Sequence, residues 1–286
     1  MDEHQGQIKP ARRSGVGCGL LIGIFLSVVI MGVALILVES AIDNEHLPFA
    51  AGMMIFYLVL GAAAFAVMKH FKISVRSITG SIGCFKENLR LSGWVIPLIV
   101  ISTCTAFIIL AIFAAINENL YKSYLELGDR LSWPAESPAI VHIMMVTSAV
   151  ILAPVIEEYI FRGILLSSWT VKWGATRAII ISSFIFAIFH IDPAGAFIAG
   201  VALCLIYFYS GSLLLVILIH MINNGLAVLA MFLLPDMFAM EAPGDAIRQL
   251  WYVIPVFVLS LLIIWQMIRK YWPAKDALPP DLRGAE

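Results

Sequence analysis

Apolar runs long enough to cross a membrane recur along almost the whole chain. A transmembrane α-helix needs about 20 predominantly apolar residues, and such runs fall at residues 16–38, 48–68, 93–116, 139–168, 177–191, 195–209, 212–233 and 250–269. Hydrophobic residues make up 61% of the 286 and charged residues only 13%, which is more apolar surface than a soluble domain of this length can bury. The sequence therefore predicts an all-α protein, a polytopic bundle of about eight transmembrane helices in a single membrane domain, 1–286.

Three of the runs depart from the usual length. The run at 139–168 is too long to cross upright, so it must tilt or protrude. The runs at 177–191 and 195–209 are short, which is tolerable where neighbouring helices shield them or where they line a polar cavity. The tail at 276–286 is rich in proline and charge, and we expect it to be disordered.

Charges in the connecting segments predict the orientation. Lysine and arginine gather in the N-terminal tail, in 69–92, in 169–177 and at the start of the C-terminal tail, whereas the intervening segments are acidic. Basic loops stay on the cytoplasmic side, so both termini are predicted to be cytoplasmic. The 69–92 segment mixes basic and apolar residues and suits a position along the interface.

Composition says little about soluble partners. The net charge of −1 gives no sign of a nucleic-acid partner, and the lipid bilayer is the partner that the apolar runs require. The four cysteines, Cys18, Cys84, Cys104 and Cys204, have neither the spacing of a disulfide framework nor that of a zinc knuckle. The oligomeric state stays open, a homo-oligomer included.

Ionisable residues inside the apolar runs are the strongest functional signal, because burying charge in a bilayer is costly. Glu158 and Arg162 are four residues apart and share one helix face, so they can pair. Glu157 is rotated by about 100° from Glu158 and is free to face another element. A purely structural ion network is the alternative explanation.

Two further groups lie in later runs. Phe186 and His190 are four residues apart, as are His220 and Asn224. A lone histidine is often a satisfied core residue, and a polar pair often bridges two membrane helices. At about 1.5 Å rise per residue, Glu157 lies about 16 Å, His190 about 20 Å and His220 about 12 Å from the cytoplasmic ends of their spans. We therefore expect these residues to meet near the midplane, beside a cavity open to the cytoplasm.

This set of side chains suits hydrolysis. A carboxylate and an imidazole can hold and deprotonate a water molecule. A second imidazole and an amide can donate hydrogen bonds to the oxyanion of a tetrahedral intermediate. Amide hydrolysis without a covalent nucleophile is therefore within reach of these residues.

The three groups together resemble the CAAX protease and bacteriocin-processing family, also called the Abi or type II CAAX prenyl protease family. Its motifs are Glu-Glu-x-x-x-Arg, Phe-x-x-x-His and His-x-x-x-Asn on successive helices, and here they begin at Glu157, Phe186 and His220. The resemblance covers the central part of the chain and implies a catalytic core at about 139–233.

The resemblance implies an eight-helix, glutamate-dependent intramembrane endopeptidase. Glu157 and His190 would then activate the water, while His220 and Asn224 would form the oxyanion site. The supporting residues would be Glu158 and Arg162, which organise the helix, and Phe186, which packs at the site.

No metal is favoured, because the chain lacks the His-Glu-x-x-His sequence of zinc peptidases. The family is often labelled metalloprotease, however, and Glu157, His190 and His220 could supply three zinc ligands. Zinc therefore stays an open alternative.

The expected substrate is a membrane-associated protein or peptide, and whether it is prenylated stays open. Short loops and the lack of appended domains suggest a multi-pass protein of the bacterial cytoplasmic membrane. A catalytically inactive scaffold or signalling modulator of the same fold is the main alternative. A transporter is a weaker one, since the sequence has no inverted repeat and no pair of helices interrupted by glycine and proline.

Overall fold

The fold is helical throughout the part of the chain that the structure describes. The structure, a computed structural model, describes residues 46–131, 136–234 and 242–283, together with a few isolated positions ahead of residue 46. Within these ranges there are helices, turns and no strand, which confirms the predicted all-α class. The run at 16–38 lies almost wholly outside the described residues, so the total of eight spans stays a prediction.

The helices follow the apolar runs closely. They are α2 Leu47–His70, α3 Val75–Thr79, α4 Phe85–Ser92, α5 Val95–Ile116, α6 Glu118–Leu131, α7 Ala139–Val146, α8 Ala153–Glu158, α9 Ser167–Trp173, α10 Ala175–Ile188, α11 Pro193–Ser210, α12 Leu213–Leu233 and α14 Pro243–Tyr271. Two π-helical segments, η2 Thr147–Leu152 and η3 Tyr159–Leu166, join α7, α8 and α9 into one continuous helix.

Six helical stretches within the described residues are long and apolar enough to cross a membrane. They are Leu47–His70, Phe85–Ile116, Ala139–Trp173, Pro193–Ser210, Leu213–Leu233 and Pro243–Tyr271. The chain is thus an integral, multi-pass membrane protein. Helix α10 is apolar but shorter, as the short run at 177–191 predicts, and the last helix begins earlier than the predicted residue 250 because Pro243 starts it.

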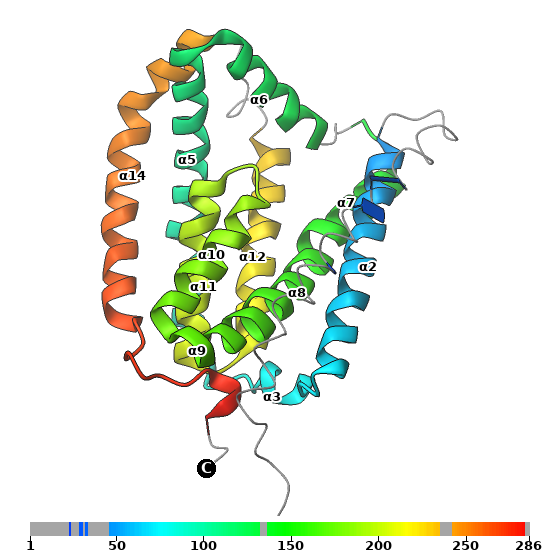
Figure 1. Ribbon diagram of the computed structural model, residues 1–286. Coiled ribbons are helices and arrows are strands. Elements are labelled where there is room, and N and C mark those ends of the chain that lie inside the picture. Colours follow the sequence, from blue (N-terminus) through cyan, green and yellow to red (C-terminus); the bar gives the residue numbers. More distant parts are fainter. Residues whose placement is uncertain are drawn as a thin grey trace, which may run out of the picture.

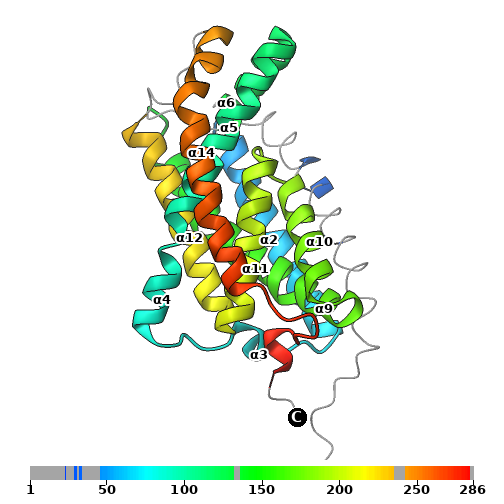
Figure 2. The ribbon, with the colours of Figure 1, turned by 90° about the vertical axis from the view of Figure 1, so that its left-hand side faces the viewer.

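Helix α11 lies at the centre of the bundle, which explains how a short span is tolerated. It packs against α10, α5, α12 and α14, and it is the most buried of the six stretches. Helix α14 runs along α5 on one side (Figure 2), and α2 packs against α7 and α8 on the other (Figure 1). Shielding by neighbours on every side replaces the lipid contacts that a short helix lacks.

The long helix from α7 to α9 crosses the bundle obliquely (Figure 1), as its excess length predicts. Pro154 near its middle has no backbone N–H to donate to the preceding turn, and the π-helical segment η2 ends directly before α8. At the start of α9, the Ser167 hydroxyl donates to the Arg162 carbonyl in η3 (3.3 Å). Wide π-helical turns therefore flank α8 on both sides, which is a common arrangement at functional sites.

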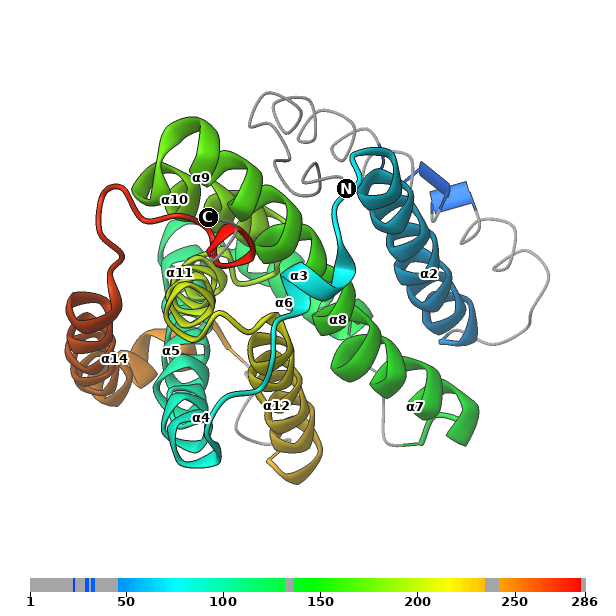
Figure 3. The same cartoon turned by 90° about the horizontal axis from the view of Figure 1, so that it is seen from below.

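The end of the bundle that carries the basic helix termini is covered by short segments. Helix α3 and the C-terminal segment lie side by side beneath the long helices (Figure 3). The Arg283 guanidinium donates to the Phe208 carbonyl near the end of α11 (2.6 Å), and Pro280–Leu282 form a 3₁₀ turn, η4. The expectation of a disordered tail was therefore wrong up to Arg283, because the tail supplies a donor to an otherwise unpaired helix-end carbonyl.

Candidate active site

Glu158 and Arg162 form an ion pair in the middle of the bundle. Arg162 Nη1 lies 2.6 Å from Glu158 Oε1, and the two side chains are 1% and 0% exposed. Arg162 Nη2 also donates to the Gly200 carbonyl on α11 (3.2 Å), and its guanidinium lies over the Phe186 ring on α10, 4.5 Å from the centroid. The pairing predicted from the four-residue spacing thus also ties the long helix to α10 and α11.

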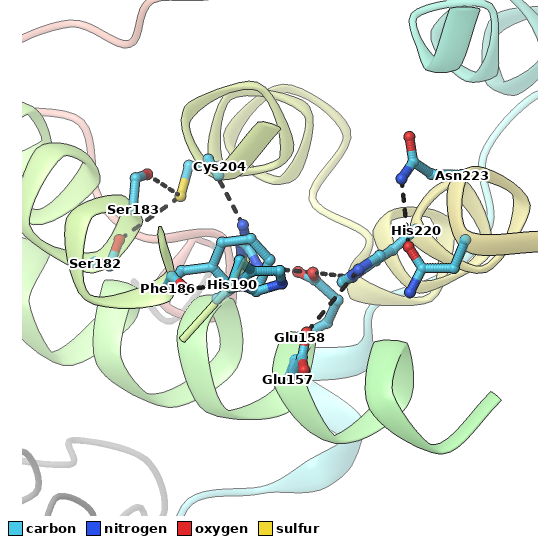
Figure 4. A network of polar contacts seen from close by, with 12 residues as sticks. Glu157, Glu158, Ser182, Ser183, Phe186, His190, Cys204, His220 and Asn223 are labelled. Carbon is cyan, nitrogen blue, oxygen red and sulfur yellow. Dashed lines mark hydrogen bonds and ion pairs between the residues drawn. The ribbon is translucent and has the colours of Figure 1, made fainter. Parts of the chain in front are cut away.

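His220 links the same glutamate to α12. Its Nδ1 lies 2.8 Å from Glu158 Oε1, while its Nε2 lies 4.0 Å from Glu157 Oε2. Figure 4 shows the His220 side chain reaching from α12 toward the two glutamates. Among the described residues both carboxylate–imidazole pairs of the site involve His220. The sequence reasoning had paired the general base with His190 instead.

Glu157 faces α2, as its rotation away from Glu158 predicts. The Tyr57 hydroxyl donates to Glu157 Oε1 (2.9 Å), and the Glu157 side chain is 13% exposed. Sequence reasoning missed Tyr57, which lies outside the three motifs. The available signal was a tyrosine within an apolar span, because a buried phenol hydroxyl usually needs a partner.

His190 lies just beyond the end of α10 rather than on the helix. Its Nδ1 lies 2.8 Å from the Phe186 carbonyl, which can only accept, so Nδ1 carries the proton and Nε2 has a free lone pair. The imidazole thereby satisfies a carbonyl at a helix C-terminus. The Phe186 ring packs near both histidines, with its centroid 4.3 Å from that of His190 and 5.9 Å from that of His220.

Asp192 holds the turn that carries His190, and sequence reasoning missed it. Its Oδ2 accepts from the hydroxyls of Ser102 (2.8 Å) and Thr105 (2.7 Å) on α5, and its Oδ1 accepts from the Gly195 amide (3.1 Å) at the start of α11. The Asp192 residue is 7% exposed. The available signal was a carboxylate directly between two apolar runs, where burial requires such donors.

Helix α6 adds to this anchor. The Tyr124 hydroxyl donates to the Ile191 carbonyl (3.2 Å). Burial raises the pKa of the Tyr124 hydroxyl, and the nearby Asp192 carboxylate adds to the rise. The His190 turn is thus held from α5, from α6 and from the first turn of α11.

Asn224 is held against the wide turn of the long helix. Its Nδ2 donates to the Ala149 carbonyl in η2 (2.9 Å), and its Oδ1 accepts from Asn223 Nδ2 (3.3 Å). One of the two Nδ2 hydrogens of Asn224 remains available, because an amide nitrogen carries two. Asn223, which the motif comparison had left aside, is therefore the immediate partner of Asn224.

A cavity of about 210 Å³ joins the two sides of the site. The polar side chains that line it include His190, His220, Asn223 and Asn224, together with Ser102 and Asp192. Phe186 also lines it. Of the predicted catalytic residues, His190, His220 and Asn224 therefore border one space, and Glu157 adjoins it through His220. The three residues thus meet in space, whereas their depth in the membrane and the opening of the cavity to the cytoplasm stay predictions.

The arrangement does not fit a three-ligand zinc site. No group of three His, Cys, Asp or Glu side chains in the described residues is placed to hold a metal ion, whereas a catalytic zinc needs three such ligands. Among the described residues His190 pairs with neither glutamate.

The fold and the site define an integral membrane protein with a polar, carboxylate- and imidazole-lined cavity inside a helical bundle. Residues 139–226, from the start of α7 into α12, match the family model described as Type II CAAX prenyl endopeptidase Rce1-like. The match covers just under a third of the chain and includes all seven site residues predicted from the motifs. It confirms the resemblance to CAAX-type intramembrane proteases. Neither the curated proteins nor the solved structures contain a significant match.

Proposed function

We propose that this chain is an intramembrane endopeptidase that hydrolyses peptide bonds of membrane-associated proteins or peptides, as CAAX-type processing proteases do. The observation that carries the proposal is the placement of His220. Its two ring nitrogens face Glu158 and Glu157 at 2.8 and 4.0 Å, and it borders a cavity that His190 and Asn224 also line. Two imidazoles and an amide thus line one cavity, and the Glu157 carboxylate adjoins it through His220.

In the proposed reaction Glu157 is the general base. It takes a proton from a water molecule, and the resulting hydroxide adds to the carbonyl carbon of the substrate. His190 helps to hold this water through Nε2, whose lone pair is free because Nδ1 donates to Phe186. When the C–N bond breaks, the amine leaving group takes up the proton that Glu157 received. The first products are a carboxylic acid and an amine, and transfer of the acid proton to the amine gives a carboxylate and an ammonium group.

His220 and Asn224 are the proposed donors to the oxyanion. Asn224 offers its remaining Nδ2 hydrogen, since the other is held by the Ala149 carbonyl. His220 presents Nε2 to the oxyanion, because its Nδ1 is held by Glu158. Prepositioned donors of this kind need no reorganisation when charge develops on the substrate oxygen.

Glu158 and Arg162 are proposed to hold these groups in place. Glu158 accepts from both Arg162 and His220, so displacing either would leave a charge unpaired in the bundle. Phe186 packs near both imidazoles and against the guanidinium of Arg162. We propose no metal for the reaction, and zinc dependence is an outcome that the experiment below detects.

A catalytically inactive scaffold or signalling modulator is the second candidate, and one observation favours it. Several polar atoms of the site already have partners within the protein, including Glu158 Oε1, His220 Nδ1 and the Asn224 amide. Such contacts would also hold a bundle together without any reaction.

Cleavage of membrane-anchored fluorogenic peptides by purified protein in nanodiscs tests the proposal. We expect the wild type to cleave and Glu157→Gln to lose about 10²–10⁴-fold in rate, the usual contribution of a general base. His190→Ala should also lose activity. Glu118→Gln is the matched control, because Glu118 is an exposed glutamate paired with Lys122 on α6. Each protein is assayed with and without a chelator.

Cleavage by Glu157→Gln at the wild-type rate would contradict the assigned base. Loss of activity with chelator and its recovery with zinc would replace the metal-free mechanism with a metal-dependent one. A folded wild type that cleaves no member of the library would favour the scaffold.

A further inference from the structure

Helix α4 lies at the edge of the bundle, at the end that carries the basic helix termini (Figure 2). Its exposed side chains include two large apolar ones, Phe85 (80% exposed) and Leu89 (62% exposed). The two are four residues apart and share one face of the helix. A helix with one such apolar face and a charged remainder is typical of the membrane interface.

Arg90 on the same helix is held in place by a tyrosine and a carboxylate. Its Nη2 donates to the Tyr209 hydroxyl at the end of α11 (3.4 Å) and lies 3.6 Å from Glu87 Oε1. A guanidinium carries five N–H donors, and the Nε and Nη1 hydrogens of Arg90 have no hydrogen-bond partner among the described residues. Arg90 therefore has donors left for a ligand while its orientation is fixed.

The C-terminal end of α14 brings more positive charge to the same place. The Tyr271 ring packs on the Tyr209 ring, with centroids 4.7 Å apart, and the Lys270 ammonium lies 5.2 Å from the centroid of the Tyr271 ring. Among the described residues, no carboxylate lies within ion-pair distance of Lys270 or Arg269. Together with Arg90, these cations make the junction of α4, α11 and α14 electropositive.

An apolar stripe leads away from these cations along α14. Leu262, Trp265 and Arg269 are three and four residues apart, so they share one face of the helix. Leu262 and Trp265 are each 56% exposed. The order leucine, tryptophan, arginine matches the order of acyl chain, interface and headgroup from the inside of a bilayer to its surface. The face therefore matches a lipid molecule both in polarity and in direction.

Two other occupants fit this surface less well. A second copy of this chain, related by a two-fold axis, would place the cations of one copy against those of the other, which is repulsive. A soluble acidic partner would meet the cations but would supply nothing apolar for Phe85 and Leu89. An anionic phospholipid meets both demands, because its phosphate is negative and its chains are apolar.

We propose that the surface formed by α4, Tyr209 and the end of α14 is a binding site for an anionic glycerophospholipid. Arg90 and Lys270 bind the phosphate, and the acyl chains lie along Leu262 and Trp265. None of these residues lines the cavity beside the histidines. The inference therefore goes beyond the proposed hydrolysis and does not depend on it.

Titration of delipidated protein in detergent with phosphatidylglycerol, or with phosphatidylcholine of the same chain length, tests the site. Native mass spectrometry counts the lipids bound to each chain. The wild type is expected to retain phosphatidylglycerol at concentrations where phosphatidylcholine is lost. Arg90→Gln and Lys270→Gln should each weaken phosphatidylglycerol binding by about fivefold, the usual effect of one cation near an anionic lipid, and should leave phosphatidylcholine binding unchanged.

Arg248→Gln is the matched control, because Arg248 also lies on an exposed surface and pairs with a carboxylate three residues away, Asp245, at the start of α14. It should bind phosphatidylglycerol like the wild type. Arg90→Lys keeps the charge and should retain most of the binding, whereas a loss equal to that of Arg90→Gln would indicate a disturbed fold and not a lost charge. The unfolding temperature of each variant in detergent is expected to equal that of the wild type.

Three outcomes would overturn the site. Phosphatidylglycerol and phosphatidylcholine could bind equally well, or Arg90→Gln and Arg248→Gln could lose phosphatidylglycerol to the same extent. Displacement of the lipid by inorganic phosphate alone would show a general anion site, and a dimer that Arg90→Gln dissociates would show that a second copy occupies the surface. Because the measurement needs no turnover, its result holds whether or not the protein cleaves peptides.

Discussion

Arg162 shows how a single residue can organise a site that it does not enter. The guanidinium contacts a carboxylate on its own helix, a ring on α10 and a backbone carbonyl on α11. Through Glu158 it also reaches His220 on α12. A charge that is buried this deeply is stable only while each partner stays in place, so the residue couples the position of His220 to the packing of three helices.

Removing Arg162 should destabilise the fold as well as stop cleavage. Arg162→Ala leaves Glu158 buried and charged without its cation, which costs about 3–5 kcal/mol in comparable cases. Thermal unfolding in detergent, monitored as the loss of soluble protein on heating, measures the change in stability.

The double variant Glu158→Gln/Arg162→Met should recover much of this stability, because no unpaired charge remains, and should still be inactive. Arg248→Ala is the control, since Arg248 forms an exposed pair with Asp245 of a kind worth about 0–1 kcal/mol. An equal loss of stability in Arg162→Ala and in Arg248→Ala would contradict the role assigned to Arg162.

Tyr57→Phe should slow cleavage without weakening substrate binding. The variant removes the hydroxyl that donates to Glu157 but keeps the ring, and a hydrogen bond to a charged group is worth about 1.5–3 kcal/mol. We therefore expect kcat to fall by roughly 10- to 150-fold, with KM unchanged because Tyr57 is not among the residues that line the cavity.

Tyr209→Phe is the matched control, because the Tyr209 hydroxyl also donates to a glutamate, Glu87, on an exposed surface. A rise in KM at unchanged kcat in Tyr57→Phe would show that the tyrosine contacts substrate rather than positioning the base.

Among the elements, the turn between α10 and α11 determines the site most directly. It places His190 beyond the end of α10, and the next helix begins three residues later, with Pro193 as the first residue and Asp192 as the cap. Asp192 accepts from the Gly195 amide and from two hydroxyls of α5. The cap that starts α11 is therefore also the contact that fixes the His190 turn against α5.

Gly195→Ala should disrupt this turn. A Cβ at Gly195 would lie 2.7 Å from Ser102 Cα and 2.7 Å from Thr105 Oγ1, and would also meet Asp192 Oδ2. Overpacking of this kind costs about 1–3 kcal/mol, and we expect a lower unfolding temperature together with a lower cleavage rate as His190 shifts.

Gly128→Ala is the control, because nothing lies within 4 Å of a Cβ there and Gly128 is inside helix α6, where alanine should stabilise by about 0.5–1 kcal/mol. A Gly195→Ala protein that unfolds and cleaves like the wild type would show that α5 can move away without cost.

At the scale of the whole molecule, the basic helix ends gather at one end of the bundle. The C-terminal ends of α2 and α14, with α3 and α9, lie together there, and α6 lies at the opposite end (Figure 1). The positive-inside rule predicts that this end faces the cytoplasm. The structure adds the C-terminal segment, which covers the same end (Figure 3).

Thiol labelling tests this orientation. Cys84 is exposed at the start of α4, whereas Cys104 and Cys204 are buried. In a Cys18→Ser background, a membrane-impermeant thiol reagent should label Cys84 in inside-out vesicles and not in intact cells.

The reverse pattern is expected for Gly244→Cys in a background that also lacks Cys84, because residue 244 lies at the start of α14, at the opposite end. Labelling of Cys84 from outside the cell would show that the predicted orientation is wrong.

Much of the architecture was predictable from the sequence, because helices that cross a bilayer need long apolar runs, and these runs are interrupted only at the loops. The bounds of α2, α5, α11 and α12 differ from the predicted runs by three residues or fewer. The Glu158–Arg162 pair was also predictable, since helix geometry places residues four apart on one face and burial leaves an arginine little alternative to pairing.

Which side chains contact one another across different helices could be seen only in the three-dimensional structure. Nothing in the local pattern indicates that Tyr57, one hundred residues before Glu157, donates to it, or that His220 rather than His190 pairs with the glutamates. These contacts depend on the tilt of the long helix and on the turn that Asp192 holds. From the sequence one can tell which polar residues must be buried together, because unpaired polar groups are costly in a membrane. Which of their atoms meet depends on how the helices pack, because contacts between distant segments depend on the relative position and rotation of the helices, which no local periodicity encodes.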